Sequence, residues 1–286
     1  MGDWDMKELA LQTAENFNKT KEEQKEVDNW LLKTEKETVV IFGAPKIGKT
    51  YAYLSIIDTE YQKDKNTLFY IINTDGGLSR SFKEYFKEKS DEISKNIRCF
   101  YAMDIKEAIK SLEEIKKNIK EKDWIIMDLM SDFWDMAQEE FTKEVSGGDV
   151  TKLIINASKD SSKFGLFDSN KWSYIKYLDN QLTMILPTRP ICNVVGVCAE
   201  KDLEVEEKRS ANKGGTEMTK LYSGIGARPA GQKQIAYKFN TILYIDGITK
   251  KQITIFGDRG KLKLGTKFNY EKNMWQEFKK VRDEIK

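Results

Sequence analysis

Short apolar runs alternate with longer amphipathic segments along most of this chain. Runs such as 38–42 and 124–128 are rich in β-branched and aromatic residues, which is typical of strands buried on both faces of a parallel sheet. The expected strands are 38–42, 67–72, 97–101, 124–128, 191–198, 242–245 and 253–256. Helical segments separate the strands up to residue 198, and the last two strands flank a turn. The pattern therefore predicts a doubly wound α/β fold with a mostly parallel sheet and a C-terminal antiparallel extension.

The segments between the expected strands carry apolar residues at helical spacing. The clearest helix begins at Asp104, where Glu107 completes a capping box and the apolar residues that follow share one face. Further helices are expected over 49–57, over 79–89, from Asn170 to the residue before Pro187, and over 271–285. Two long segments break this alternation: 137–170 is mostly polar, and 201–234 is rich in glycine and charge without periodicity. We expect both to be functional or mobile loops.

The two ends of the chain differ from the alternating core. Residues 1–36 are highly charged and helix-compatible with an interrupted apolar stripe, so they predict an N-terminal helical arm. This arm either packs on the edge of the sheet or docks on a neighbouring subunit. Residues 271–286 predict a C-terminal helix, which leaves 37–270 as the core.

Composition excludes several classes of chemistry. The 48 basic and 46 acidic residues nearly cancel, which argues against a generally basic nucleic-acid binder but leaves room for a local basic channel. The absence of histidine removes histidine bases and histidine-ligated metals. Cys99, Cys192 and Cys198 lie in apolar runs without C-x-x-C spacing and predict buried free thiols. Without an apolar span of 18 residues, the protein is expected in the cytoplasm rather than in a membrane.

The candidate chemistry begins directly after the first expected strand. The segment there matches the phosphate-binding P-loop G-x-x-x-x-G-K-[ST]. It consists of Gly43, Ala44, Pro45, Lys46, Ile47, Gly48, Lys49 and Thr50. Glycines let the backbone wrap around an anion, and the following helix supplies amide donors and a positive dipole end. We expect Lys49 to reach the β- and γ-phosphates and the Thr50 hydroxyl to bind Mg²⁺.

Other charged residues follow the expected parallel strands, whose carboxyl ends share one edge of the sheet. Asp128 ends the strand 124–128 and predicts a second Mg²⁺ ligand. Asp75 follows the strand 67–72 and either orients the attacking water or only forms a turn, since Asp-Gly-Gly is an ordinary turn sequence. Glu200 and Lys201 follow the strand 191–198.

These motifs resemble the RecA-like ATPases. The P-loop, the strand that ends in Asn-Thr-Asp75-Gly-Gly and the run Trp124–Asp128 followed by Leu-Met-Ser carry the resemblance, which covers about residues 36–265. The most similar group is the small RecA-type NTPases of phages and archaeal viruses, which resemble single-strand-annealing and recombination ATPases. The resemblance implies a RecA fold that acts on DNA as a ring or filament with ATP. In that group a Glu commonly takes the place of Asp75, and a polar sensor the place of Glu200 or Lys201.

The resemblance also suggests residues that act between subunits and on DNA. Arg259 and Lys261 resemble the basic residues that RecA-like proteins insert into a neighbour's active site, or are solvated surface charges. The loops 137–170 and 201–234 are the expected contacts with single-stranded DNA, or are mobile surface loops. The second loop combines a stacking candidate, Tyr222, with basic residues: Lys201, Lys208, Arg209, Lys213, Lys220, Arg228 and Lys233.

The sequence therefore predicts an oligomeric, Mg-ATP-dependent RecA-like ATPase that acts on single-stranded DNA in recombination, repair or replication. A P-loop kinase of a small molecule is one alternative, but it needs a lid with clustered arginines, and the arginines of this chain do not cluster. A nucleotide-binding switch or scaffold that does not hydrolyse ATP is another. That alternative agrees with Asp75 as a turn residue.

Overall fold

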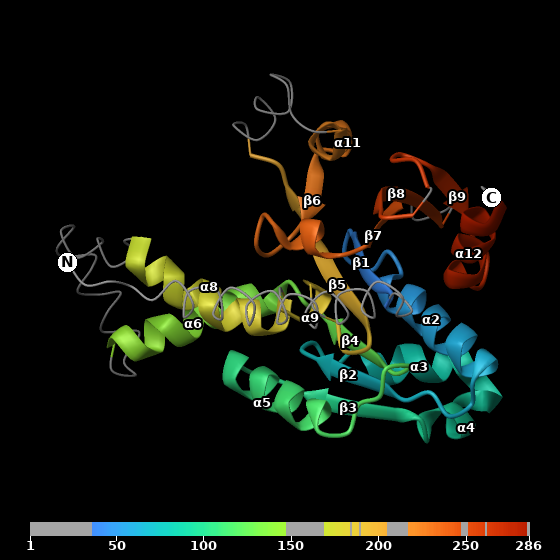
Figure 1. The fold of residues 1–286 in the computed structure, drawn as a ribbon, viewed down its shortest axis with the longest axis horizontal. Coiled ribbons are helices and arrows are strands. Elements are labelled where there is room, and N and C mark those ends of the chain that lie inside the picture. The colour runs from blue at the N-terminus through green and yellow to red at the C-terminus, as the bar shows by residue number, and fades with distance from the viewer. Residues whose placement is uncertain are drawn as a thin grey trace, which may run out of the picture. The chain divides into compact units, whose positions relative to one another are not determined.

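The computed structural model describes residues 36–146, 169–183, 185–188, 190–204, 217–246, 251–260 and 262–284. Contacts divide the chain into two compact units, Met1–Glu35 and Lys36–Lys286. All described elements belong to the second unit, and Figure 1 labels them along the chain. Apart from Lys36, the expected N-terminal arm lies outside the described residues.

The described strands and helices follow the alternation that the sequence predicts. The strands are β1 (Thr38–Gly43), β2 (Phe69–Asn73), β3 (Ile97–Tyr101), β4 (Trp124–Asp128), β5 (Asn193–Asp202), β6 (Ala227–Pro229), β7 (Thr241–Asp246), β8 (Gln252–Asp258) and β9 (Lys267–Asn269). The α-helices are α2 (Lys49–Lys63), α3 (Leu78–Phe86), α4 (Ser90–Ser94), α5 (Ile105–Lys116), α6 (Asp132–Ser146), α8 (Ser169–Thr183), α9 (Ile185–Thr188), α11 (Glu217–Ile225) and α12 (Met274–Glu284). Short 3₁₀ helices are η1 (Lys87–Lys89) and η3 (Ile235–Lys238).

The described strands form one sheet in the order β3-β2-β4-β5-β1-β7-β8-β9, and β6 pairs with β5. The pairs from β3 to β7 are all parallel, whereas β8 and β9 add antiparallel strands at one side. The predicted doubly wound, mostly parallel α/β fold with a C-terminal antiparallel extension is confirmed. One detail differs: β7 runs parallel to β1, so the antiparallel extension starts only at β8.

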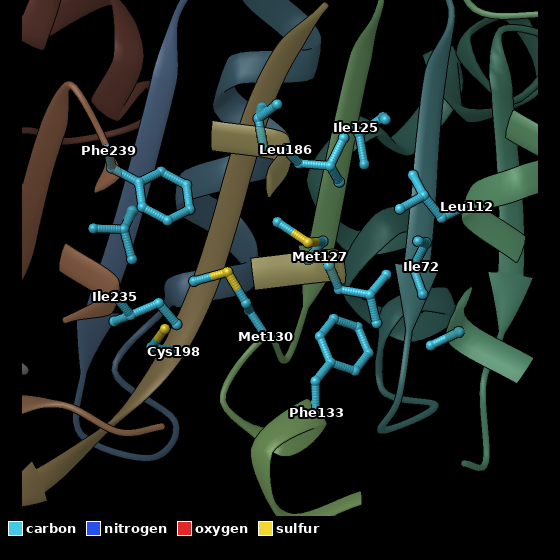
Figure 2. Close-up of a cluster of buried hydrophobic side chains, with 14 of the residues drawn as sticks. Ile72, Leu112, Ile125, Met127, Met130, Phe133, Leu186, Cys198, Ile235 and Phe239 are labelled. Carbon is cyan, nitrogen blue, oxygen red and sulfur yellow. The ribbon is translucent and has the colours of Figure 1, made fainter. Parts of the chain in front are cut away.

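Helices cover both faces of the sheet because alternate residues of each strand point to opposite sides. Val40 and Phe42 of β1 belong to a core shared with α5, α6, α8, α9 and α11, whereas Val39 and Ile41 face α2, α3, α4 and α12. Figure 2 shows part of the first core. Its labelled residues are Ile72, Leu112, Ile125, Met127, Met130, Phe133, Leu186, Cys198, Ile235 and Phe239. Both faces of the parallel strands are therefore dry, as their apolar sequence predicts.

The C-terminal helix α12 is part of the second core. Trp275 is fully buried, and its indole nitrogen donates to the Glu60 carboxylate on α2 over 2.9 Å. Its backbone nitrogen donates to the Ser55 hydroxyl over 3.1 Å. The indole also stacks on Phe278, with ring centroids 5.0 Å apart. These contacts hold α12 against α2, the helix that follows the P-loop.

The two expected loops contain regular structure, which corrects the sequence prediction. Helix α6 extends to Ser146, and it buries Phe133, Ala137 and Phe141, which lie four residues apart on one helical face. The second expected loop contains the end of β5, all of α11 and all of β6. Residues 147–168 and 205–216 lie outside the described residues.

The cysteine prediction holds for two of the three residues. Cys192 and Cys198 are buried, but Cys99 is exposed because β3 is the edge strand of the sheet. None of the helices in the described ranges combines the length and apolar character that a bilayer span requires.

A buried carboxylate lies between α8 and the segment after β6. Asp179 is 1% exposed, and its carboxylate accepts hydrogen bonds from the Thr183 hydroxyl and the Gln232 amide. Its second oxygen has no partner among the described residues. Burial raises the pKa of Asp179 to about 6, although the two hydrogen bonds oppose the shift.

We expect Asp179 to make stability depend on pH. In the unfolded chain this carboxyl loses its proton near pH 4, whereas in the folded chain it keeps the proton up to about pH 6. The folded state then binds more protons between these values, so stability falls as pH rises through this window. Asp179→Asn should remove the loss and raise the free energy of unfolding by on the order of 2 kcal/mol at pH 7.5 relative to pH 4.

Urea denaturation of both proteins at the two pH values measures this effect. Asp64→Asn is the matched control, since Asp64 is exposed and its pKa is lowered by a hydrogen bond from Lys122. The control should show a small change of the opposite sign. An Asp179→Asn protein with the same pH dependence as wild type contradicts the prediction.

Candidate nucleotide site at the carboxyl edge of the sheet

The P-loop connects β1 to α2 through a backbone that needs glycine at both ends. A side chain at Gly43 would place its Cβ 2.9 Å from the carbonyl oxygen of Ile245 on β7. Gly48 has a φ of 104° and forms the N-cap of α2, a conformation that L-residues with side chains rarely adopt. Lys46 is also left-handed, with a φ of 61°. The loop thus brings the N-terminus of α2, with its unpaired amides, to the end of β1.

The Lys49 side chain lies inside this loop. Its ammonium donates to the carbonyl oxygens of Gly43 at 2.9 Å and Ala44 at 2.7 Å. Burial lowers the pKa of Lys49, and nearby negative charges, first Glu200 and then Asp128, oppose the shift. Thr50 follows it, half-buried in the first turn of α2. The structure therefore places both predicted P-loop side chains at the carboxyl edge of the sheet.

Asp128 ends β4 and is only 2% exposed. The hydroxyl of Tyr53, one turn after Lys49 on α2, donates to its carboxylate over 2.8 Å. Burial raises the pKa of Asp128 to about 7; the charge of Asp75 adds to the shift, whereas the Tyr53 hydrogen bond and Lys49 oppose it. Because α2 contacts Asp128 one turn below the P-loop, Lys49 and Asp128 belong to one site.

Asp75 lies at the same edge, but its carboxylate is used in a turn. The residue is exposed, and one carboxylate oxygen accepts from the backbone nitrogen of Gly77 over 2.9 Å, just before α3 begins. The adjacent Thr74 bonds to the end of β4: its backbone nitrogen donates to the Asp128 carbonyl and its hydroxyl to Asp132. The charge of Asp75 still reaches Asp128 and Lys49, since it shifts the pKa of both.

Glu200 is nearer to the P-loop than the sequence suggests. Strand β5 continues to Asp202, so Glu200 and Lys201 lie within the strand rather than after it. Residue Ala199 pairs with Gly43, the first residue of the P-loop. The half-buried Glu200 carboxylate accepts from the Tyr244 hydroxyl over 3.5 Å. The length of β5 is the detail that sequence reasoning missed, and the polar run 200–202 gave no signal for it.

Arg259 lies at the opposite edge of the sheet. It follows β8, whose last residue Asp258 pairs with Thr241, and Thr241 in turn pairs with Val39 near the start of β1. At about 3.3 Å per residue, β1 separates this end from the P-loop by roughly 13 Å. Arg259 is exposed and does not belong to the P-loop site of its own chain. Lys261 lies outside the described residues.

Two of the residues proposed for DNA contact are buried. Tyr222 stacks on Phe256 with ring centroids 5.1 Å apart, and Arg228 donates to the carbonyl oxygen of Pro229. Neither can offer its side chain to a nucleic acid in this conformation, which corrects the prediction. Exposed basic candidates in the described part of the second loop are Lys201, Lys220 and Lys233, while Lys208, Arg209 and Lys213 lie outside it.

The oxygen ligands at the P-loop suit a magnesium ion. Among the described residues, no three histidine, cysteine, aspartate or glutamate side chains gather closely enough to hold a metal by themselves. Mg²⁺ needs no such cage, since it is commonly bound by one or two carboxylates, a hydroxyl, water and substrate phosphates. Thr50 and Asp128 supply a hydroxyl and a carboxylate of this kind.

An apolar pocket of about 270 Å³ lies at the β3 edge, away from the P-loop. Its lining comes mainly from α3 and β3 and includes Phe82, Ile97 and Tyr101. None of the predicted site residues lines it, so it is separate from the candidate nucleotide site.

Comparison with known proteins finds distant structural likeness only. No protein-family model matches this sequence, and no curated protein matches it. Similar solved structures include the crystal structure of the RadB recombinase, with a TM-score of 0.44 and 13% identity over 82% of this chain and 86% of that chain. Another is the ATPase domain of a helicase, with a TM-score of 0.38 and 12% identity over 82% of this chain and 80% of that chain. At such distances, the fold and the site rest on the strand order and side-chain contacts described above.

The contact between Tyr53 and Asp128 should have a measurable effect on stability. Tyr53→Phe removes the one hydroxyl that donates to this buried carboxylate, so we expect the free energy of unfolding at pH 8 to fall by about 1–3 kcal/mol. Tyr61→Phe is the matched control on the same helix, because its partner Glu92 is exposed to solvent. Chemical denaturation of both variants is the measurement, and equal losses would contradict the special role of the buried pair.

Proposed function

We propose that this protein is a RecA-like ATPase that hydrolyses Mg-ATP and acts on single-stranded DNA as an oligomer. The observation that carries the proposal is the joining of Lys49 and Asp128 in one site through α2, whose Tyr53 binds Asp128. A site with a phosphate-binding loop, a lysine and a buried carboxylate is suited to a metal-bound triphosphate. The sequence resemblance supports the phage and archaeal-virus type and a place in recombination, repair or replication in the cytoplasm.

In this proposal each residue of the site has a defined task. The loop amides from Gly43 to Thr50 bind the phosphates, and Lys49 exchanges its carbonyl partners for the β- and γ-phosphate oxygens. Thr50 and Asp128 hold Mg²⁺, which neutralises charge that develops on the phosphates. A carboxylate that orients the attacking water completes the site. Asp75 is the residue that the sequence resemblance suggests, and Glu200 is the other candidate at this edge.

Oligomer formation and DNA binding have separate support. Arg259 is about 13 Å of strand away from its own P-loop edge, so it could act as a finger only in the site of a neighbouring subunit. The exposed Lys201, Lys220 and Lys233 supply positive charge on the described part of the second segment proposed for single-stranded DNA. The first segment offers its undescribed residues 147–168 for the same task.

A switch that binds ATP without hydrolysing it is the second candidate. The observation in its favour is the hydrogen bond from Gly77 to Asp75, because an Asp75 engaged in a turn leaves its proposed role in hydrolysis without support. In such a protein ATP would bind tightly and phosphate release would be negligible with or without DNA.

Phosphate release with and without single-stranded DNA, at two protein concentrations, tests the proposed activity. We expect DNA to stimulate release and the rate per subunit to rise with protein concentration. Lys49→Ala should lower the rate at least about 100-fold, because Lys49 stabilises charge on the transferred phosphoryl group. Lys63→Ala, an exposed lysine in the last turn of the same helix, is the control and should leave the rate unchanged. A rate that ignores both DNA and protein concentration would contradict the hypothesis of an oligomeric, DNA-dependent ATPase.

Mixed oligomers test whether Arg259 acts in the neighbour's site. Arg259→Ala retains its P-loop, and Lys49→Ala retains its arginine, so mixing the two inactive proteins should restore about a quarter of the interfaces in a head-to-tail assembly. The matched control mixes Lys49→Ala with Asp128→Asn. Both substitutions damage the same site, and this mixture should stay inactive. Without any recovery in the first mixture at any ratio, the finger role of Arg259 is wrong.

A further inference from the structure

We propose that Glu200, rather than Asp75, is the carboxylate that orients the attacking water and accepts its proton. This inference rests on the proposed ATP hydrolysis and names the base of that same site. It departs from the sequence resemblance, which assigns the task to the residue after β2. Three independent observations support it: strand order, a hydrogen bond that crosses β1, and the charges around Lys49.

Strand order places the three carboxylates at different distances from the P-loop. In the sequence of neighbours β2-β4-β5-β1, Glu200 lies on the strand next to β1, Asp128 two strands away and Asp75 three strands away. At about 4.8 Å per strand, these separations are roughly 5, 10 and 14 Å across the sheet. The pairing of Ala199 with Gly43 puts Glu200 one residue beyond the start of the P-loop. Of the three, Glu200 has the shortest path to the γ-phosphate position.

The hydrogen bond from Tyr244 fixes where the Glu200 carboxylate lies. Tyr244 belongs to β7 and Glu200 to β5, and these strands flank β1 on opposite sides. A bond between their side chains must therefore pass over β1. Tyr244 pairs with Phe42, and the two rings are 4.9 Å apart on the same face. The Glu200 carboxylate is thus held above the end of β1, where the chain turns into the P-loop.

The surrounding charges agree with this position. Among the negative groups that act on the Lys49 ammonium, Glu200 is first, ahead of Asp128 and Asp75. Burial and the charge of Glu200 raise the pKa of Tyr244 to about 12, so Tyr244 stays protonated and remains a donor at neutral pH. Tyr244 is the single donor to Glu200 among the described residues and binds one oxygen. The other oxygen is available to accept a hydrogen bond from water.

The chemistry requires one proton acceptor beside the water. The water oxygen attacks the γ-phosphorus and forms the new P–O bond, while the bond from that phosphorus to the β–γ bridging oxygen breaks. The bonding electron pair leaves with ADP, and a proton of the water passes to the Glu200 carboxylate. Asp75, which is exposed and bound to Gly77, contributes only through its charge.

Glu200→Gln keeps the size of the side chain and the acceptor for Tyr244 but removes the base. We expect its kcat for phosphate release to fall at least about 100-fold, while the Kd for a fluorescent ATP analogue stays within about threefold of wild type. The acid limb of the wild-type pH–rate profile should disappear in this variant. Asp75→Asn should lose no more than about tenfold, since only a remote charge is removed. Glu204→Gln, the same chemical change at an exposed position, controls for the substitution itself.

The outcomes separate this inference from the proposed function. If wild-type protein releases no phosphate with or without DNA, the proposed ATPase activity fails and the assignment of Glu200 fails with it. If wild type is active and Glu200→Gln retains kcat within about threefold, the assignment alone is overturned. An equal loss in Asp75→Asn also overturns it, as does a Glu200→Gln protein whose only defect is weaker nucleotide binding. A thermal melting temperature for Glu200→Gln close to that of wild type shows that the variant is folded.

Discussion

The hydrogen bond between Tyr53 and the buried carboxylate of Asp128 ties the P-loop helix to the metal-binding strand. Asp128 ends β4 inside the core, where burial raises its pKa to about 7, and Tyr53 is the residue of α2 that reaches it. Because Tyr53 is one turn from Lys49, this bond fixes the axial position and rotation of α2 relative to β4. The P-loop, the phosphate-binding lysine and the proposed Mg²⁺ ligands are therefore placed by one buried contact.

The same edge of the sheet concentrates negative charge around one lysine. Glu200, Asp128 and Asp75 all act on Lys49, and Asp75 also acts on Asp128. Like charges so close together raise one another's pKa and make a divalent cation favourable beside them. Their distances from β1 increase in the order of their strands, which suggests a division of labour: the nearest carboxylate for the water, the middle one for the metal, and the farthest for the turn before α3.

Much of the architecture was predictable because each segment carries its own local signal. The apolar runs became strands within one or two residues, except that β5 is longer, and the order of strands and helices along the chain was right. The polar stretches failed for a physical reason. Helix α6 buries only a narrow stripe of Phe133, Ala137 and Phe141, which charged residues separate in the sequence. Strand β6 has three residues and exists because it pairs with β5, so no periodicity could indicate it.

The sequence by itself determined the P-loop, since its glycines, its lysine and the helix start are constraints within eight neighbouring residues. It also determined that Asp75 and Asp128 end strands of a parallel sheet, because parallel strands carry their polar ends to one edge. Tertiary structure alone decided which strands are neighbours. Pairing between distant segments placed Glu200 beside the P-loop, put Arg259 at the opposite edge and buried Tyr222. These placements depend on contacts between residues far apart in the chain, which residue spacing does not encode.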